Sequence, residues 1–200
     1  MLDMPRVSQH MRKWFANHFH EERCGFMTRH DKTASMIFVL LLAAGSAWIS
    51  TGSARAAELV STHNDWKAYR HGTGDERMCF AVSEPSEANP QGGRREGPHI
   101  YVTAWPKAGI KAEISVLVGA SLNKNAEIQI SVDGNRFELF PDGDRAYVSD
   151  ADDELKLLDA MRRGRSMTVT STSAEGKQMR DTYSLLGLTA AIQSMSSGCS

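Results

Sequence analysis

The sequence has few of the residues that build common active sites. It holds seven histidines, and only His63, His71 and His99 lie beyond residue 56. None of these three is spaced from a cysteine or from another histidine as a metal ligand would be. The chain also has no Gly-x-Ser-x-Gly elbow and no glycine-rich phosphate loop. We therefore expect no metal, no cofactor and no locally encoded catalytic site.

Long apolar runs are also scarce, and the one that exists lies near the N-terminus. Residues 36–49 are uncharged and mostly apolar, follow Arg29 and Lys32, and precede the triplet Ala54-Arg55-Ala56. This order is typical of a secretory signal peptide, with cleavage between Ala56 and Ala57. The run is short for a membrane span, which needs about 20 residues, although an uncleaved anchor is the alternative. We expect residues 1–56 to be the signal peptide, with a true start at Met27.

A basic excess is missing from the rest of the chain. Residues 1–56 hold seven of the 23 Lys and Arg and four of the 24 Asp and Glu, which leaves 16 basic and 20 acidic residues, a net charge of −4. Nucleic-acid binding is not expected of such a chain. Residues 57–200 are long enough for one domain with its own core. We expect this domain in the periplasm, or secreted to the cell surface, and in contact with the membrane only if the signal segment stays uncleaved.

Cysteine is rare, and this makes the pairing simple. Cys24 lies in the predicted signal segment, so Cys79 and Cys199 are the two that remain. An even number of cysteines in an exported chain favours a disulfide. The alternative is two unpaired buried thiols. A Cys79–Cys199 bond would close almost the whole domain into one loop.

What the chain does have is a series of short alternating segments. In Trp66–Tyr69 and in 98–105, apolar residues recur at every second position, as they do in strands with one buried face. Asp133-Gly134 is a favoured hairpin turn. Residues 57–64 resemble a loose leader. Eight or nine strands are expected, at 65–70, 77–83, 98–105, 111–119, 126–133, around 137–139, at 145–149, 166–173 and 180–185.

Two segments change to a helical period. Residues 152–163 carry acids at their start, with Asp150 as the predicted N-cap and Gly164 as a left-handed C-terminal residue. Their predicted apolar stripe is Leu155, Leu158 and Met161. Residues 186–196 carry an apolar stripe of Leu188, Ala191, Ile192 and Met195. The expected fold is mainly β, an antiparallel sandwich or barrel-like domain with two short helices.

Several clusters have both a functional and a structural interpretation. Asp150, Asp152 and Asp153 are explained better by helix capping than by calcium binding, because the spacing of a calcium loop is incomplete. Arg162, Arg163 and Arg165 fit a solvated helix end as well as an anion site. For the strand aromatics, core packing is preferred over a ligand platform; these are Trp66, Tyr69, Tyr101 and Trp105. The long segment 84–97 is a surface loop and either a partner contact or a disordered insertion.

Several features in a fixed order resemble a known family. A Trp66-x-x-Tyr69 strand precedes Cys79-Phe-Ala-Val-Ser83 and a Pro-rich loop. Ala160-Met-Arg-Arg-Gly164 and Ser173-x-x-Gly176 lead to Asp181-Thr-Tyr-Ser-Leu-x-Gly-Leu188, and Cys199 closes the chain. The set, over roughly residues 65–199, resembles the invasion-associated locus B family of exported α-proteobacterial proteins. The resemblance implies a periplasmic or surface-associated β-rich domain and brings no catalytic residues.

The sequence thus favours a non-enzymatic protein of the cell envelope that binds an unknown envelope or host protein. A periplasmic hydrolase with an unrecognised Ser/His site is the alternative, because catalytic triads are recognised by geometry and not by sequence order. His71 or His99 beside a serine and an acid in a cleft would favour the enzyme.

Overall fold

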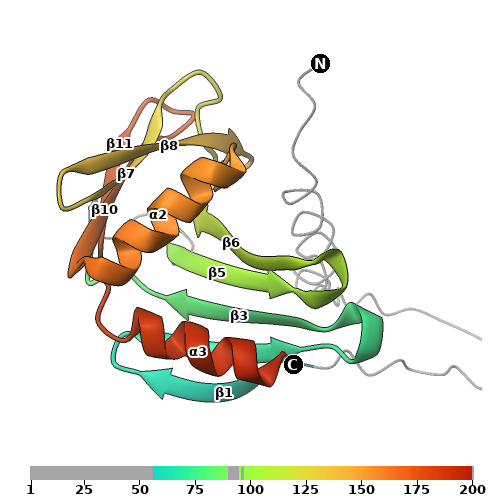
Figure 1. Ribbon diagram of the computed structural model, residues 1–200. Coiled ribbons are helices and arrows are strands. Elements are labelled where there is room, and N and C mark those ends of the chain that lie inside the picture. The colour runs from blue at the N-terminus through green and yellow to red at the C-terminus, as the bar shows by residue number, and fades with distance from the viewer. Residues whose placement is uncertain (1–55, 90–94, 96, 200) are drawn as a thin grey trace, which may run out of the picture.

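The computed structural model describes residues 56–89, 95 and 97–199. The predicted signal segment, with its Met27 start, lies outside these residues apart from Ala56. Within these residues, eleven antiparallel strands form one continuous sheet, and two α-helices lie against it (Figure 1). The predicted fold class is confirmed, with more strands than expected. The strands are β1 (Glu58–His63), β2 (Trp66–His71), β3 (Met78–Ser83), β4 (Glu87–Asn89), β5 (His99–Trp105), β6 (Ile110–Leu117), β7 (Ile128–Val132), β8 (Asn135–Asp142), β9 (Arg145–Val148), β10 (Ser166–Thr172) and β11 (Gln178–Ser184).

The strand order explains how so many short strands make one core. It runs β1-β2-β3-β5-β6-β9-β8-β7-β10-β11-β4, so most neighbours are joined by hairpins. Asp133 and Gly134 have φ of 47° and 87°, as the predicted hairpin between β7 and β8 requires. The sheet curves so that its two halves share one apolar interior, and β1 and β4 are its edges (Figure 1).

The alternation along the central strands builds the core. Side chains at every second position point to the same face, and one face of β2, β3 and β5 is buried almost completely. Each large aliphatic side chain fully buried there contributes roughly 1.5–3 kcal/mol. The residues of this face are Trp66, Ala68, Cys79, Ala81, Ile100, Val102 and Ala104.

Helix α2 (Ala151–Arg163) begins within one residue of its predicted start, but the face that it buries is rotated about the helix axis from the predicted one. The carboxylate of Asp150 accepts hydrogen bonds from the backbone N–H groups of Asp152 and Asp153, so the predicted N-cap is confirmed. The buried stripe is Leu157, Leu158 and Met161, whereas Leu155 is 65% exposed. Glu154 completes this stripe at helical spacing, and a glutamate is not expected at such a position. The predicted place of Leu155 in the core is therefore wrong.

Gly164 does not take the predicted left-handed conformation. Its φ is −77°, and the chain continues directly into β10. The position has little room for a side chain because an added Cβ would lie 2.7 Å from Cγ1 of Val132. Close packing against β7, and not backbone handedness, explains glycine here.

Helix α3 (Leu188–Gly198) packs on the core face of β1, β2 and β3. Its predicted stripe is buried in full: Leu188, Ala191, Ile192 and Met195. The helix starts two residues later than expected, since Gly187 has a φ of 95° and is the N-cap. A disulfide joins Cys79 on β3 to Cys199 after the helix, with the Cα atoms 5.9 Å apart.

Three segments predicted to lack strands contain them. Residues 57–64, predicted as a leader, form edge strand β1, which has exposed side chains on both faces and so no clear alternation. The 84–97 loop contains β4, which pairs with β11 and forms the other edge of the sheet. Pro141 and Asp142 belong to β8, and the turn is confined to Gly143 and Asp144. In the described part of the chain, no helix has the length and apolar character needed to cross a bilayer.

Candidate binding groove

The candidate site is a groove on the outer face of β2, β3 and β5, the face turned away from α3. Both helices lie on the other side of these strands (Figure 1). The groove has a volume of about 460 Å³, within the range of small-molecule sites. We call it the β2–β3–β5 groove. Its lining residues are Asn64, Asp65, Lys67, Tyr69, Met78, Phe80, Val82, Ser83, Glu84, Pro85, Ser86, His99, Tyr101, Thr103 and Ser184.

The strand register brings the floor together. Tyr69 lies opposite Phe80, and Phe80 lies opposite Thr103, so these three residues form one row across the strands. The next row contains Lys67, Val82 and Tyr101. Because side chains alternate along a strand, these rows point away from Ala68, Ala81 and Val102 of the core. The alternation that builds the core therefore also builds the groove.

Aromatic rings dominate the floor. The rings of Tyr69 and Phe80 are stacked, with centroids 5.2 Å apart and an interplanar angle of 14°. The Phe80 and Tyr101 rings are 6.0 Å apart and tilted by 56°. The His99 ring also stacks on Tyr101, with centroids 5.9 Å apart, and the Arg145 guanidinium lies 5.6 Å from the centre of the Tyr101 ring. Aromatic pairs at these separations are favourable beyond their buried area.

The beginning of the 84–97 segment forms one wall. Glu84, Pro85 and Ser86 line the groove, and the Ser86 hydroxyl donates to the Thr182 carbonyl at 3.1 Å. His99 donates from Nδ1 to the Gly97 carbonyl at 2.7 Å, and its Nε2 lies 3.7 Å from Glu84 Oε1. The wall is thus connected to β5 and β11.

The far end of the same segment is fixed by a buried ion pair. The Arg95 guanidinium donates to both carboxylate oxygens of Asp181, at 2.9 Å and 2.5 Å, and also to the Val118 carbonyl. Asp181 is 1% exposed. A bidentate Arg–carboxylate pair fixes orientation as well as distance. With β4 paired to β11, the segment is anchored at two points.

Thr103 and Glu113 are two buried polar side chains next to each other. They are cross-strand partners on β5 and β6, and their exposed fractions are 0% and 1%. Within the described residues, neither Thr103 Oγ1 nor either carboxyl oxygen of Glu113 has a hydrogen-bond partner. Unsatisfied buried polar groups are uncommon in folded proteins and are costly. Thr103 is part of the groove floor, so a bound ligand could supply its partner.

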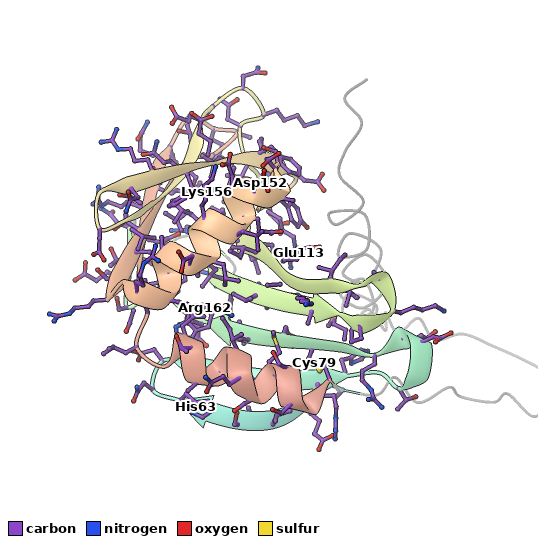
Figure 2. The ribbon with its side chains drawn as sticks, viewed as in Figure 1. His63, Cys79, Glu113, Asp152, Lys156 and Arg162 are labelled. Atoms are coloured by element: carbon purple, nitrogen blue, oxygen red, sulfur yellow. A yellow bond between two sulfur atoms is a disulfide. The ribbon has the colours of Figure 1, made fainter. Side chains whose placement is uncertain are left out.

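Glu113 is also close to a second carboxyl group. Burial raises the pKa of Glu113 to about 9, and the charge of Glu154 adds to this increase. Burial raises the pKa of Glu154 to about 7, opposed by the hydrogen bond of 2.7 Å that its Oε1 accepts from the Ile114 N–H. Glu113 is thus protonated at neutral pH. Figure 2 shows Glu113 on β6, near the end of α2 at which Asp152 lies.

Of the two histidines predicted as catalytic candidates, His71 ends β2 and does not line the groove. His99 lies in the groove, but the described residues give it no bond to a serine. His63 Nε2 lies 2.9 Å from the Ser194 hydroxyl, connecting β1 to α3 outside the groove (Figure 2). No carboxylate in the described part of the chain bonds the other ring nitrogen of His63. The His–Ser–acid arrangement that would favour a hydrolase is not assembled around His99 or His63.

Of the four strand aromatics predicted to pack in the core, only Trp66 does so, whereas Tyr69, Tyr101 and Trp105 are half-buried and lie outside it. Trp66 is fully buried and donates from Nε1 to the Ser184 carbonyl at 3.0 Å. Tyr69 and Tyr101 line the groove. Glu113 and Glu154 were missed altogether, because a lone glutamate in a strand and a glutamate in the first turn of a helix both look like solvated residues. Only the pairing of β5 with β6 reveals Glu113 as the neighbour of Thr103.

The fold and groove together define a disulfide-closed, antiparallel β domain with a candidate binding face. The family model described as "Invasion associated locus B (IalB) protein" matches residues 66–196, and the chain belongs to this family. The crystal structure of invasion associated protein B from Bartonella henselae is similar, with a TM-score of 0.50 and 17% sequence identity. The similarity covers 70% of this chain and 97% of that one, and at this identity it shows the fold alone. No curated protein matches the sequence.

Proposed function

We propose that the chain is an exported, non-enzymatic binding protein of the cell envelope and that the β2–β3–β5 groove is its binding site. One observation carries this proposal: three aromatic rings from adjacent strands floor a groove that also contains a buried hydroxyl with no hydrogen-bond partner in the described part of the chain. A preformed, largely apolar pocket with a few polar groups is the usual form of a ligand site. The partner is a component of the envelope or of a host cell.

Export is supported by the sequence and by the disulfide. The predicted cleavage between Ala56 and Ala57 would release the chain at the start of β1, with the whole sheet retained. A disulfide that holds the last helix to a central strand suits an oxidising compartment. N-terminal sequencing of protein recovered from the periplasm tests this part of the proposal. A mature N-terminus at Ala57 is expected, and recovery of the chain only from the cytoplasm would contradict it.

Retention on isolated cell envelope tests the binding role. Protein purified from cells that express the full chain is passed over an envelope fraction, and the amount retained is compared between wild type, Tyr69→Ala and Phe140→Ala. Phe140 is the matched control because it also stacks on a tyrosine, Tyr147 at 5.7 Å, but does not line the groove. We expect only Tyr69→Ala to lose retention. Equal retention of all three proteins would contradict the proposal.

The hydrolase alternative has one supporting observation, the hydrogen bond between His63 and Ser194. An activated serine needs a base that a third group orients, and the described residues supply no such group to His63. We therefore expect wild type and Ser194→Ala to hydrolyse an activated acyl ester at the same background rate. Activity that disappears in Ser194→Ala would favour the enzyme.

A further inference from the structure

We infer that the β2–β3–β5 groove binds the sugar rings of an oligosaccharide. This inference rests on the proposed function, since it names the ligand class of the same site. It follows from three properties of the groove: the arrangement of its aromatic rings, the balance of charge on its rim, and the unsatisfied hydroxyl in its floor. None of these properties is shared with the core face of the same strands.

The ring arrangement suits a flat ligand with C–H groups on its faces. The π face of an aromatic ring is negative, and the axial C–H groups of a pyranose ring carry a small positive charge. Tyr69 and Phe80 form a parallel pair, and Tyr101 is tilted beside them. Tyr69 and Tyr101 are only half-buried. His99 and the Arg145 guanidinium already lie against the Tyr101 ring, so the Tyr69–Phe80 pair is the main stacking position offered to a sugar ring, with Tyr101 beside it.

The rim suits a ligand that is rich in hydroxyl groups and not strongly charged. Lys67 donates hydrogen bonds, Asp65 and Glu84 accept them, and Asn64 can do both. The lining thus carries two acidic side chains and one lysine, a net charge of −1, which gives a strongly charged ligand little to pair with. Sugar hydroxyls both donate and accept, and they can therefore use each of these groups.

The floor supplies the most specific contact. Thr103 Oγ1 is fully buried, lines the groove and has no hydrogen-bond partner among the described residues. A sugar hydroxyl placed there can donate a hydrogen bond to Thr103 Oγ1 or accept one from it. The loss of a buried hydrogen bond is worth about 0.5–1.5 kcal/mol, which corresponds to a change in affinity of roughly two- to tenfold.

A peptide strand is a poorer fit to this face. β2, β3 and β5 are interior strands, each paired on both sides, so their backbone N–H and C=O groups are already used. Strand addition requires a free sheet edge. A ligand in the groove must be recognised by side chains alone, as saccharides commonly are.

The test is titration calorimetry with three trisaccharides as probes: maltotriose, cellotriose and chitotriose. Thr103→Val keeps the shape of the side chain and removes its hydroxyl. Ser171→Ala is the control, because Ser171 is 3% exposed and its hydroxyl also has no partner among the residues that the structure describes, but it lies on β10 away from the groove. We expect at least one probe to bind wild type and Ser171→Ala equally, and Thr103→Val about two- to tenfold more weakly. Absence of binding by all three probes, or equal binding by Thr103→Val, would overturn the inference.

A second arm separates this inference from the proposed function. The envelope fraction is treated with periodate, which cleaves sugar diols, or with protease, before the retention measurement. We expect periodate to abolish retention and protease to leave it. The opposite result, with retention still dependent on Tyr69, would show that the groove binds a protein; it would overturn the saccharide inference and leave the proposed function intact.

Discussion

Glu113 and Glu154 show how burial changes the chemistry of single residues in this domain. Both carboxyl groups are held in a fold that favours their protonated forms, and their pKa values rise to about 9 and about 7. The unfolded chain ionises both groups near the ordinary value of 4.5. At pH values between 4.5 and the raised pKa values, the folded protein binds more protons than the unfolded one. The free energy of unfolding must therefore fall as the pH rises through this range.

Glu113→Gln tests this linkage. In wild type, we expect the free energy of unfolding to decline between pH 7 and pH 9, by at most about 1.4 kcal/mol per pH unit for one proton. Glutamine has no proton to lose, so the decline over this window should shrink in the variant to the small part that Glu154, with a pKa of about 7, contributes near pH 7. Urea denaturation at several pH values measures it. Glu138→Gln, at an exposed position of β8, is the control and should keep the wild-type slope.

The buried Arg95–Asp181 ion pair should contribute more to the free energy of unfolding than the surface ion pairs do. Asp181→Asn would leave a guanidinium that is only 10% exposed without its counter-charge. We expect a loss of about 3 kcal/mol or more in the free energy of unfolding, measured by urea denaturation. Asp75→Asn removes the partner of Lys107 in an exposed pair and should cost less than about 1 kcal/mol. Equal effects of the two substitutions would mean that Asp181 is not a structural anchor.

At the scale of elements, the junction between β11 and α3 is the most constrained point. Gly187 has a φ of 95°, and an added Cβ would lie 2.0 Å from the His63 carbonyl oxygen. Helix α3 can therefore approach β1 only because this residue has no side chain. The junction sets the position from which α3 reaches Cys199.

We expect Gly187→Ala to destabilise the domain far more than Gly109→Ala. Gly109 also has a positive φ, 71°, but its added Cβ would meet nothing within 4 Å. Its substitution should cost only the backbone strain, about 1–2 kcal/mol. Gly187→Ala should cost the same strain and, in addition, displacement of α3 from β1. Thermal unfolding of the two variants measures the difference, and similar melting temperatures would contradict the role of the junction.

Whether an element could be predicted from the sequence depends on how local its sequence signal is. The stripe of α3 and the Asp150 cap are encoded within a few residues, and both were predicted. β1 and β4 were missed because edge strands bury little and show no clear alternation. The rotation of α2 was missed because Glu154 occupies a position of the buried stripe, where pattern reasoning expects an apolar residue.

The groove was harder to predict than the fold for a related reason. Its row of Tyr69, Phe80 and Thr103 depends on the register of three strands separated by a turn and by the 84–97 segment. Strand pattern assigns these residues to the face opposite the core, but it does not show which of them become neighbours. Without knowledge of that register, core packing is the simpler interpretation of a tyrosine on a strand.

At the scale of the whole molecule, the disulfide holds the first half of the sheet to the last helix. Cys79 and Cys199 are 120 residues apart in sequence, so the bond restricts most of the domain in its unfolded state. For a loop of this length, the chain-entropy estimate is roughly 4–5 kcal/mol. That is a large part of the about 5–15 kcal/mol by which domains are usually stable.

Cys79→Ser, Cys199→Ser and the double substitution test this contribution. Each single substitution breaks the same bond, so we expect similar losses of up to about 4 kcal/mol, with little further loss in the double variant. Guanidinium denaturation measures the three values. Additive losses would indicate that the cysteines stabilise the fold separately.

Backbone NMR shows where this domain binds its partner. Amide shifts of the labelled protein are recorded before and after addition of solubilised envelope components. We expect the shifted amides to cluster on the β2–β3–β5 groove, at Lys67, Tyr69, Phe80, Tyr101 and Thr103, while those of α2 and β8 stay in place. Shifts concentrated on α2 or on the β1 edge, or no shifts at all, would contradict binding at the groove.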